Sequence, residues 1–155
     1  MLKERGVIRN VNRAAQLNNF KDLLRRSPLS GNMTITPTDI DGLLDYNGRA
    51  FVYLEGKVIG NKTGDGQRLA LENMVNSHHK AGNPAMALIY KHNTPVTEQV
   101  PVAYCFVHGI YCHRQIGNLC HTRYNGGYWW WPQTKTIKVL TAIENFEKEF
   151  QIYTL

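Results

Sequence analysis

Long apolar runs are missing from this chain of 155 residues. No stretch approaches the ~20 apolar residues that a membrane-spanning helix requires. The first residues, Met1 to Gly6, are not followed by the apolar segment of a secretory signal. Cysteine is also scarce, and its three residues are an odd number, which argues against a disulfide framework. We therefore expect a cytoplasmic protein without structural disulfides.

Several catalytic signatures are missing as well. The glycine-rich stretch from Gly60 to Gly66 lacks the Gly-Lys-Ser/Thr ending of a P-loop, and neither Gly-x-Ser-x-Gly nor His-Glu-x-x-His occurs. Acidic residues are few, because 12 Asp and Glu stand against 18 Lys and Arg, which gives a net charge of +6. A basic chain attracts polyanions, with nucleic acid the leading candidate, although ribosomal and membrane-surface roles give the same balance.

The patterning of apolar residues predicts a single folded domain over residues 1–155, because no repeat, linker or low-complexity segment interrupts it. Helices are predicted where apolar residues recur at helical spacing, and strands where apolar runs are short or alternating. The predicted helices cover residues 11–26, 65–80 and 136–150, and the predicted strands cover 41–46, 49–55, 85–90, 102–107 and the aromatic segment up to Pro132. This order predicts an α/β fold.

The first two predicted strands form a hairpin that carries the most informative side chains. Asn47-Gly48 is typical of a two-residue type I′ turn. Counting outward from this turn, Asp41 falls opposite Leu54, one residue short of Glu55. Glu55 and Lys57 point to the same side of the strand, because strand side chains alternate. Sheet twist or a bulge would bring Asp41 to that side too.

The end of this hairpin has the composition of a divalent-cation site. Two converging carboxylates repel each other unless a cation lies between them, and hard oxygen ligands favour magnesium or manganese. A lysine beside the metal orients a water or neutralises charge on a reacting phosphate. Asp41, Glu55 and Lys57 are therefore candidate site residues. An ordinary surface ion pair at a polar hairpin end is the open alternative.

Residues 33–80, roughly, resemble the core of the PD-(D/E)XK nuclease superfamily, in which a hairpin carries an Asp and then Glu-x-Lys, and a helix follows. The resemblance implies that Asp41 and Glu55 bind magnesium, that Gly56 lends its backbone carbonyl, and that Lys57 positions the attacking water. It also implies a restriction-endonuclease-like αβββαβ core, with a central mixed β-sheet flanked by helices on both faces.

Two positions depart from the family pattern. Asp39 follows Pro37 by two residues and so competes with Asp41 for the ligand role. Gly56 stands where an apolar side chain is usual, and we expect it to loosen the strand and leave a gap on the opposite face of the sheet.

The helix after the hairpin adds further candidates. Gln67 lies where some members of the superfamily have a Gln that contacts the nucleophile or DNA, but the accompanying Tyr is replaced by Leu71, so a plain helix-surface glutamine is the alternative. Glu72 is predicted to be structural. Lys62 and Arg68, close by in sequence, are predicted phosphate contacts for nucleic acid.

Cysteine and histidine gather between residues 105 and 121. A set Cys105-x2-His108-x3-Cys112-x7-Cys120 has the soft ligands that zinc prefers. The short Cys-x2-Cys knuckles of common zinc sites are absent, so buried cysteines and exposed histidines without metal are the favoured interpretation. The neighbouring Trp129, Trp130 and Trp131 allow base stacking, but strand alternation favours packing of all three.

Together these features predict a magnesium- or manganese-dependent nuclease that hydrolyses DNA phosphodiester bonds, structure-selective or weakly sequence-selective. The resemblance implies a small phage-type or Holliday-junction-resolvase-like enzyme and, less directly, a homodimer. Two alternatives stay open. One is a non-catalytic nucleic-acid-binding or inhibitor protein on a nuclease-like scaffold, and the other is a zinc-stabilised interaction domain.

Overall fold

The computed structural model describes residues 22, 24–26, 28, 32, 34–35, 40–61, 64–117, 119–133 and 136–154. The chain divides into two units, Met1–Pro37 and Thr38–Leu155, and each is described by itself. In the first unit, strands β1 (Arg25–Arg26) and β2 (Thr34–Ile35) pair antiparallel. The helix predicted over residues 11–26 is therefore wrong at residues 24–26, and most of its remainder lies outside the described residues. A single domain over residues 1–155 stays a prediction.

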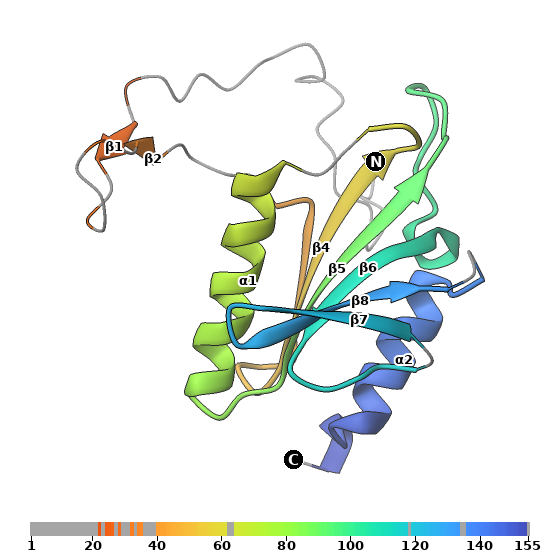
Figure 1. The fold of residues 1–155 in the computed structure, drawn as a ribbon. Coiled ribbons are helices and arrows are strands. Elements are labelled where there is room, and N and C mark those ends of the chain that lie inside the picture. Colours follow the sequence, from red (N-terminus) through yellow and green to blue (C-terminus); the bar gives the residue numbers. More distant parts are fainter. Residues whose placement is uncertain are drawn as a thin grey trace, which may run out of the picture. The chain divides into compact units, whose positions relative to one another are not determined.

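The second unit contains a mixed six-stranded sheet with the order β3-β4-β5-β6-β8-β7 (Figure 1). Strands β4 and β5 are parallel, and every other neighbouring pair in this sheet is antiparallel. The strands are β3 (Gly42–Asp45), β4 (Phe51–Val58), β5 (Ala85–His92), β6 (Phe106–Cys112), β7 (Leu119–Tyr124) and β8 (Gly127–Pro132). The predicted α/β class with a mixed sheet is confirmed.

One helix covers each face of this sheet (Figure 1). Helix α1 (Asp65–Lys80) forms the crossover between β4 and β5, and its Leu71 and Val75, one turn apart, pack against the sheet in a cluster that includes Tyr53 and Trp129. Helix α2 (Val139–Glu149) covers the opposite face. The predicted placement of helices on both faces is confirmed.

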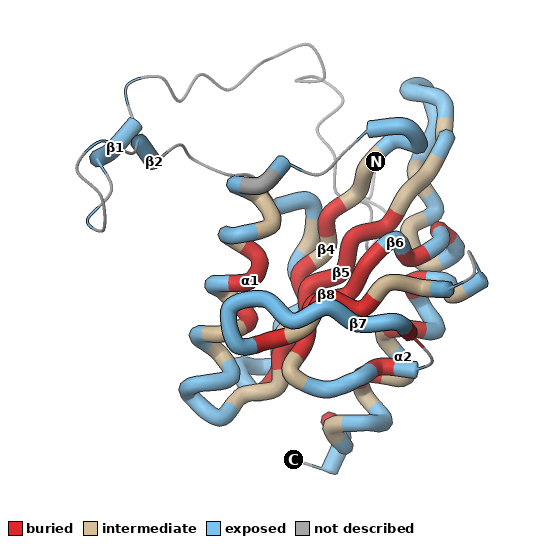
Figure 2. The backbone as a smooth tube through the Cα atoms, in the orientation of Figure 1, coloured by how far each residue is buried: buried red, intermediate tan, exposed pale blue. Residues whose placement is uncertain are grey.

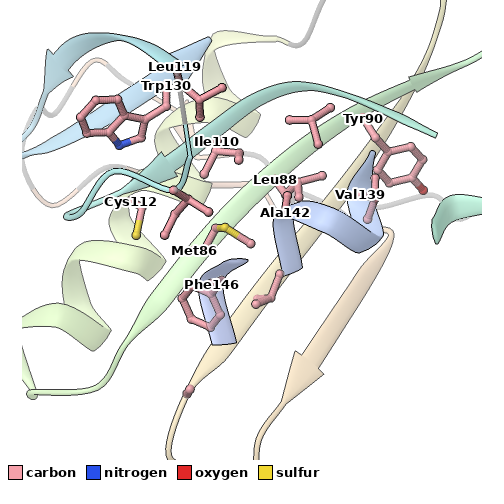
Figure 3. Packing of buried hydrophobic residues seen from close by; sticks show 14 of the residues in the cluster. Met86, Leu88, Tyr90, Ile110, Cys112, Leu119, Trp130, Val139, Ala142 and Phe146 are labelled. Carbon is pink, nitrogen blue, oxygen red and sulfur yellow. The ribbon is translucent and has the colours of Figure 1, made fainter. Parts of the chain in front are cut away.

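The larger core cluster lies between the sheet and α2 (Figure 3). Strands β5 and β6 supply its centre, with Met86, Leu88 and Ile110 fully buried. Phe146 of α2 packs on them and is also fully buried. Figure 2 shows the buried residues concentrated in the central strands and the exposed ones along β7. The central strands are therefore the rigid support for side chains that emerge at their ends.

Three element predictions need correction. The strand predicted over residues 102–107 begins only at Phe106, because Val102–Tyr104 form a 3-10 helix. Helix α2 begins at Val139, three residues later than predicted, and no side chain caps it. Strand β7 was not predicted, because it lies at the sheet edge with most of its residues exposed and therefore lacks apolar alternation.

None of the described helices is both long and apolar enough to cross a membrane.

Candidate functional site

The turn of the β3–β4 hairpin contains one residue more than the sequence predicts. Asn47 and Gly48 have positive φ angles of 55° and 77°, as a type I′ turn requires. Arg49 N donates to Tyr46 O at 3.1 Å and closes the turn. Tyr46 N then donates to Ala50 O at 3.0 Å rather than to Arg49. Arg49 is therefore an extra, bulged residue on the returning side of the hairpin.

This bulge sets the register of the hairpin and so the position of Asp41 along β4. Gly42 pairs with Leu54, so continuing the register places Asp41 opposite Glu55. The predicted register, with Asp41 opposite Leu54, is wrong by one residue, and a bulge is the physical reason. Asp41 Oδ2 accepts a hydrogen bond from Gly56 N at 2.7 Å. This bond holds the exposed Asp41 carboxylate at the end of β4, beside the Glu-x-Lys segment.

Glu55, Lys57 and Gln67 form a closed set of charge-assisted hydrogen bonds on the α1 face of the sheet. Lys57 Nζ lies 2.8 Å from Glu55 Oε1 and donates to Gln67 Oε1 at 2.7 Å. Gln67 Nε2 donates to the same Glu55 oxygen at 2.9 Å. Glu55 is only 3% exposed, and the Lys57 side chain keeps 18% of its surface. Gln67 is therefore part of the cluster, and the interpretation of a plain helix-surface glutamine is wrong.

The opposite face below Gly56 is filled by Tyr90. Tyr90 pairs with Gly56 in the parallel β4–β5 register. A Cβ atom on Gly56 would lie 2.6 Å from both Cζ and Oη of Tyr90, closer than real side chains approach. The expected gap opposite Gly56 is therefore wrong, because the Tyr90 ring occupies that space. Burial, and after it the Asp41 carboxylate, raises the pKa of Tyr90 to about 12.

Arg68 lies on an aromatic surface near the cluster. Its Cζ is 5.0 Å from the ring centroids of both Trp129 and Trp131, which stack at 5.4 Å with an interplanar angle of 15°. Among the described residues, no carboxylate lies within ion-pairing distance of Arg68. Glu72, one turn along α1, instead accepts hydrogen bonds from Trp129 Nε1 at 2.6 Å and Asn125 Nδ2 at 2.7 Å. Arg68 is thus a positioned cation, and Glu72 has the predicted structural role.

The three consecutive tryptophans pack rather than project. Trp129 is fully buried on the α1 face, and Trp130 is 7% exposed on the α2 face, as strand alternation predicts. Trp131 is half-buried, and its ring lies 2.7 Å from where a Cβ on Gly109 would be. The Trp131 ring thus lies between Gly109 and Arg68. The structure therefore favours packing over base stacking for all three tryptophans.

The cysteine and histidine cluster does not converge. Cys105 and Cys112 are buried and donate to the carbonyl oxygens of Pro101 and Ala85, respectively, whereas Cys120 is exposed. Burial raises the pKa of the Cys112 thiol to about 11. Within the described ranges, no group of three or more His, Cys, Asp or Glu side chains is placed to hold a metal ion. The zinc set suggested by the sequence is therefore not assembled.

Two predicted site residues, Asp39 and Lys62, lie outside the described residues. The competition between Asp39 and Asp41, and the phosphate contact of Lys62, stay predictions. Tyr90, which lies against Gly56, was not predicted from the sequence. The signal available for it was Gly56 itself, since a strand glycine often marks a close approach by another group.

The oxygen donors at the hairpin end fit a hard divalent cation. Asp41 is exposed and uses only Oδ2 in its bond to Gly56, and Glu55 lies opposite it in the continued register. Carboxylates and a backbone carbonyl suit magnesium, which also keeps several waters and therefore does not need a complete protein cage. Asp41 and Glu55 are two such groups, and the described residues hold no set of three or more His, Cys, Asp or Glu side chains placed for a metal ion.

The chain has no match among the known proteins with which it was compared. Neither a family model, nor a curated protein, nor a solved structure matches it.

Proposed function

We propose that this protein is a magnesium-dependent nuclease that hydrolyses DNA phosphodiester bonds at the end of the β3–β4 hairpin. One observation supports the proposal most directly. Glu55, Lys57 and Gln67 are linked by contacts of 2.7 Å to 2.9 Å, beside the Asp41 carboxylate. The restriction-endonuclease-like core belongs to the same proposal. Its support is the succession of hairpin, helix α1 and parallel strand β5.

The proposed roles follow from chemistry and placement. Asp41, Glu55 and the Gly56 carbonyl would hold the cation, which when bound stabilises negative charge on the phosphate and lowers the pKa of water. Lys57 has three ammonium donors, and Glu55 and Gln67 take two of them. The third donor is available for the attacking water or a phosphate oxygen. Gln67 keeps the Lys57 ammonium next to Glu55.

Substrate binding in this proposal uses the positive charge of the chain. The net charge of +6 favours a phosphate backbone. Arg68, one residue after Gln67 and held over Trp129 and Trp131, is the proposed phosphate contact, and Lys62 is a second one on sequence grounds. Structure-selective cleavage and a homodimer remain part of the proposal, on the resemblance alone.

A second candidate, a non-catalytic nucleic-acid-binding protein on this scaffold, is favoured by one observation. Glu55 is 3% exposed, and its Oε1 already receives both Lys57 and Gln67. A buried carboxylate with two such partners is stable without a metal. Both candidates predict DNA binding that weakens with salt, and only the nuclease predicts metal-dependent cleavage.

The test is cleavage of supercoiled plasmid and of a branched oligonucleotide duplex, with magnesium, with manganese and with chelator. We expect cleavage only with a metal, and its loss in Glu55→Gln and Lys57→Met. Matched controls are Glu144→Gln on exposed α2 and Lys80→Met in the last turn of α1, which make the same charge changes far along the chain. Circular dichroism and thermal melting establish that each variant folds. Cleavage that persists in Glu55→Gln and Lys57→Met contradicts the proposal.

A further inference from the structure

The contact between Gly56 and Tyr90 lies on the α2 face of the sheet, behind the Glu55 and Lys57 side chains of the candidate site. Tyr90 belongs to the core cluster on the α2 face and is 6% exposed (Figure 3). Its ring reaches across to β4, with Oη 2.6 Å from where the Gly56 Cβ would be. On the β3 side, Gly56 N donates to Asp41 Oδ2 at 2.7 Å. One residue thus separates the phenol from the carboxylate.

We infer that Tyr90 is a positioning residue of the metal site, whose hydroxyl orients the Asp41 carboxylate toward the cation. This inference rests on the proposed function, because it assigns Asp41 as a ligand. In metal sites, groups that hydrogen-bond to a ligand fix its orientation, and their removal typically weakens metal binding by about 10- to 100-fold.

The donor and acceptor inventories support this role. Among the described residues, the Tyr90 hydroxyl makes no hydrogen bond, and Asp41 uses only one of its carboxylate oxygens. Tyr90 Oη is not among the described buried atoms that lack a partner, so water reaches it. An ordinary phenol is protonated at neutral pH and so carries a hydrogen-bond donor. The phenol therefore has a free donor that reaches the Asp41 carboxylate through one water.

The same contact explains why position 56 is glycine. Any side chain there would overlap the Tyr90 ring.

The experiment compares manganese affinity of the full chain and of Tyr90→Phe, by isothermal titration calorimetry and by the electron paramagnetic resonance signal of free Mn²⁺. Tyr90→Phe keeps the ring and removes only Oη. Tyr53→Phe is the matched control: Tyr53 is equally buried in β4, on the opposite face, and its hydroxyl bonds to His78 Nε2 at 2.6 Å. Asp41→Asn is the reference for a lost ligand.

We expect Tyr90→Phe to bind Mn²⁺ about tenfold more weakly and Tyr53→Phe to bind as the unaltered chain does. Equal affinity in Tyr90→Phe and the unaltered chain overturns the inference and leaves the nuclease proposal standing. Weakened binding in Tyr90→Phe, together with no cleavage by the unaltered chain, upholds the inference and overturns the nuclease. Absence of Mn²⁺ binding by the unaltered chain overturns both.

Discussion

Replacing Glu72 by alanine should weaken the attachment of helix α1 to the β7–β8 hairpin. Glu72 is 5% exposed, and its two oxygens accept from Trp129 Nε1 at 2.6 Å and from Asn125 Nδ2 at 2.7 Å. Asn125 O in turn accepts from Asn76 Nδ2 at 2.9 Å, which returns the chain of contacts to α1. The carboxylate is thus the centre of a network that links the helix to the far end of the hairpin.

The expected loss of unfolding free energy follows from these contacts. A hydrogen bond to a charged group contributes about 1.5–3 kcal/mol, and a buried donor left without a partner costs about 1–3 kcal/mol. Trp129 is fully buried, so its indole N–H would lose the one partner that it has among the described residues, without access to water. Asn125 is exposed, and water can replace its bond. We therefore expect Glu72→Ala to lose about 3 kcal/mol, mostly through Trp129.

Urea unfolding monitored by tryptophan fluorescence and circular dichroism measures this loss. Glu72→Gln keeps one acceptor for Trp129 but cannot accept from Asn125 in the same way, so about half the loss is expected. Glu144→Ala on exposed α2 is the control and should stay within about 0.5 kcal/mol of the unaltered chain. In a Trp129→Phe background, Glu72→Ala should cost at least about 1 kcal/mol less. A loss below about 0.5 kcal/mol for Glu72→Ala would refute this account. So would losses for Glu72→Ala and Trp129→Phe that add within about 0.5 kcal/mol, which is the usual error of additivity.

Three further changes test other parts of the structure. Gly56→Ala should lose about 1–3 kcal/mol in urea unfolding by overlap with Tyr90, and the loss should shrink in a Tyr90→Leu background; unchanged stability argues against the contact. Burial and a neighbouring imidazole lower the pKa of His113, so its neutral form stabilises the fold above the ordinary histidine pKa, and this contribution falls as the pH drops through the lowered value. The urea concentration at the unfolding midpoint should therefore decrease when the pH is lowered from 7.5 to 5.5, about one unit either side of the ordinary histidine pKa of about 6.5. The decrease should be smaller in His113→Gln, and equal decreases contradict this prediction. Arg68→Ala should weaken binding of a DNA duplex in chelator and reduce the salt slope by about 1, whereas Arg123→Ala on edge strand β7 should not; equal effects remove Arg68 as a phosphate contact.

The elements with strong local patterning were predictable from sequence. Helix α1 was predicted at its observed bounds because Leu71 and Val75 mark an apolar face and Gly82 follows its end. The hairpin turn was predicted because Asn47-Gly48 favours positive φ at both positions. Edge strand β7 gave no such signal, because every side chain after Leu119 is exposed and the strand carries no alternation.

The candidate site was predictable in its members but not in its geometry. Glu55 and Lys57 were expected on one side of the strand, and the structure places them so. The position of Asp41 depended on one bulged residue, Arg49, whose presence is a matter of backbone hydrogen bonding rather than residue type. Tyr90 entered only through tertiary structure, since it lies on a strand that follows a helix and approaches Gly56 across a parallel pair.

The most direct test of the central claim is the anomalous scattering of manganese in crystals soaked with MnCl₂. The account predicts a peak at the open end of the β3–β4 hairpin, bound by carboxylate oxygens of Asp41 and Glu55 and by the Gly56 carbonyl oxygen. A map with no peak there, in which Glu55 still contacts Lys57 and Gln67 as it does without metal, would contradict the account.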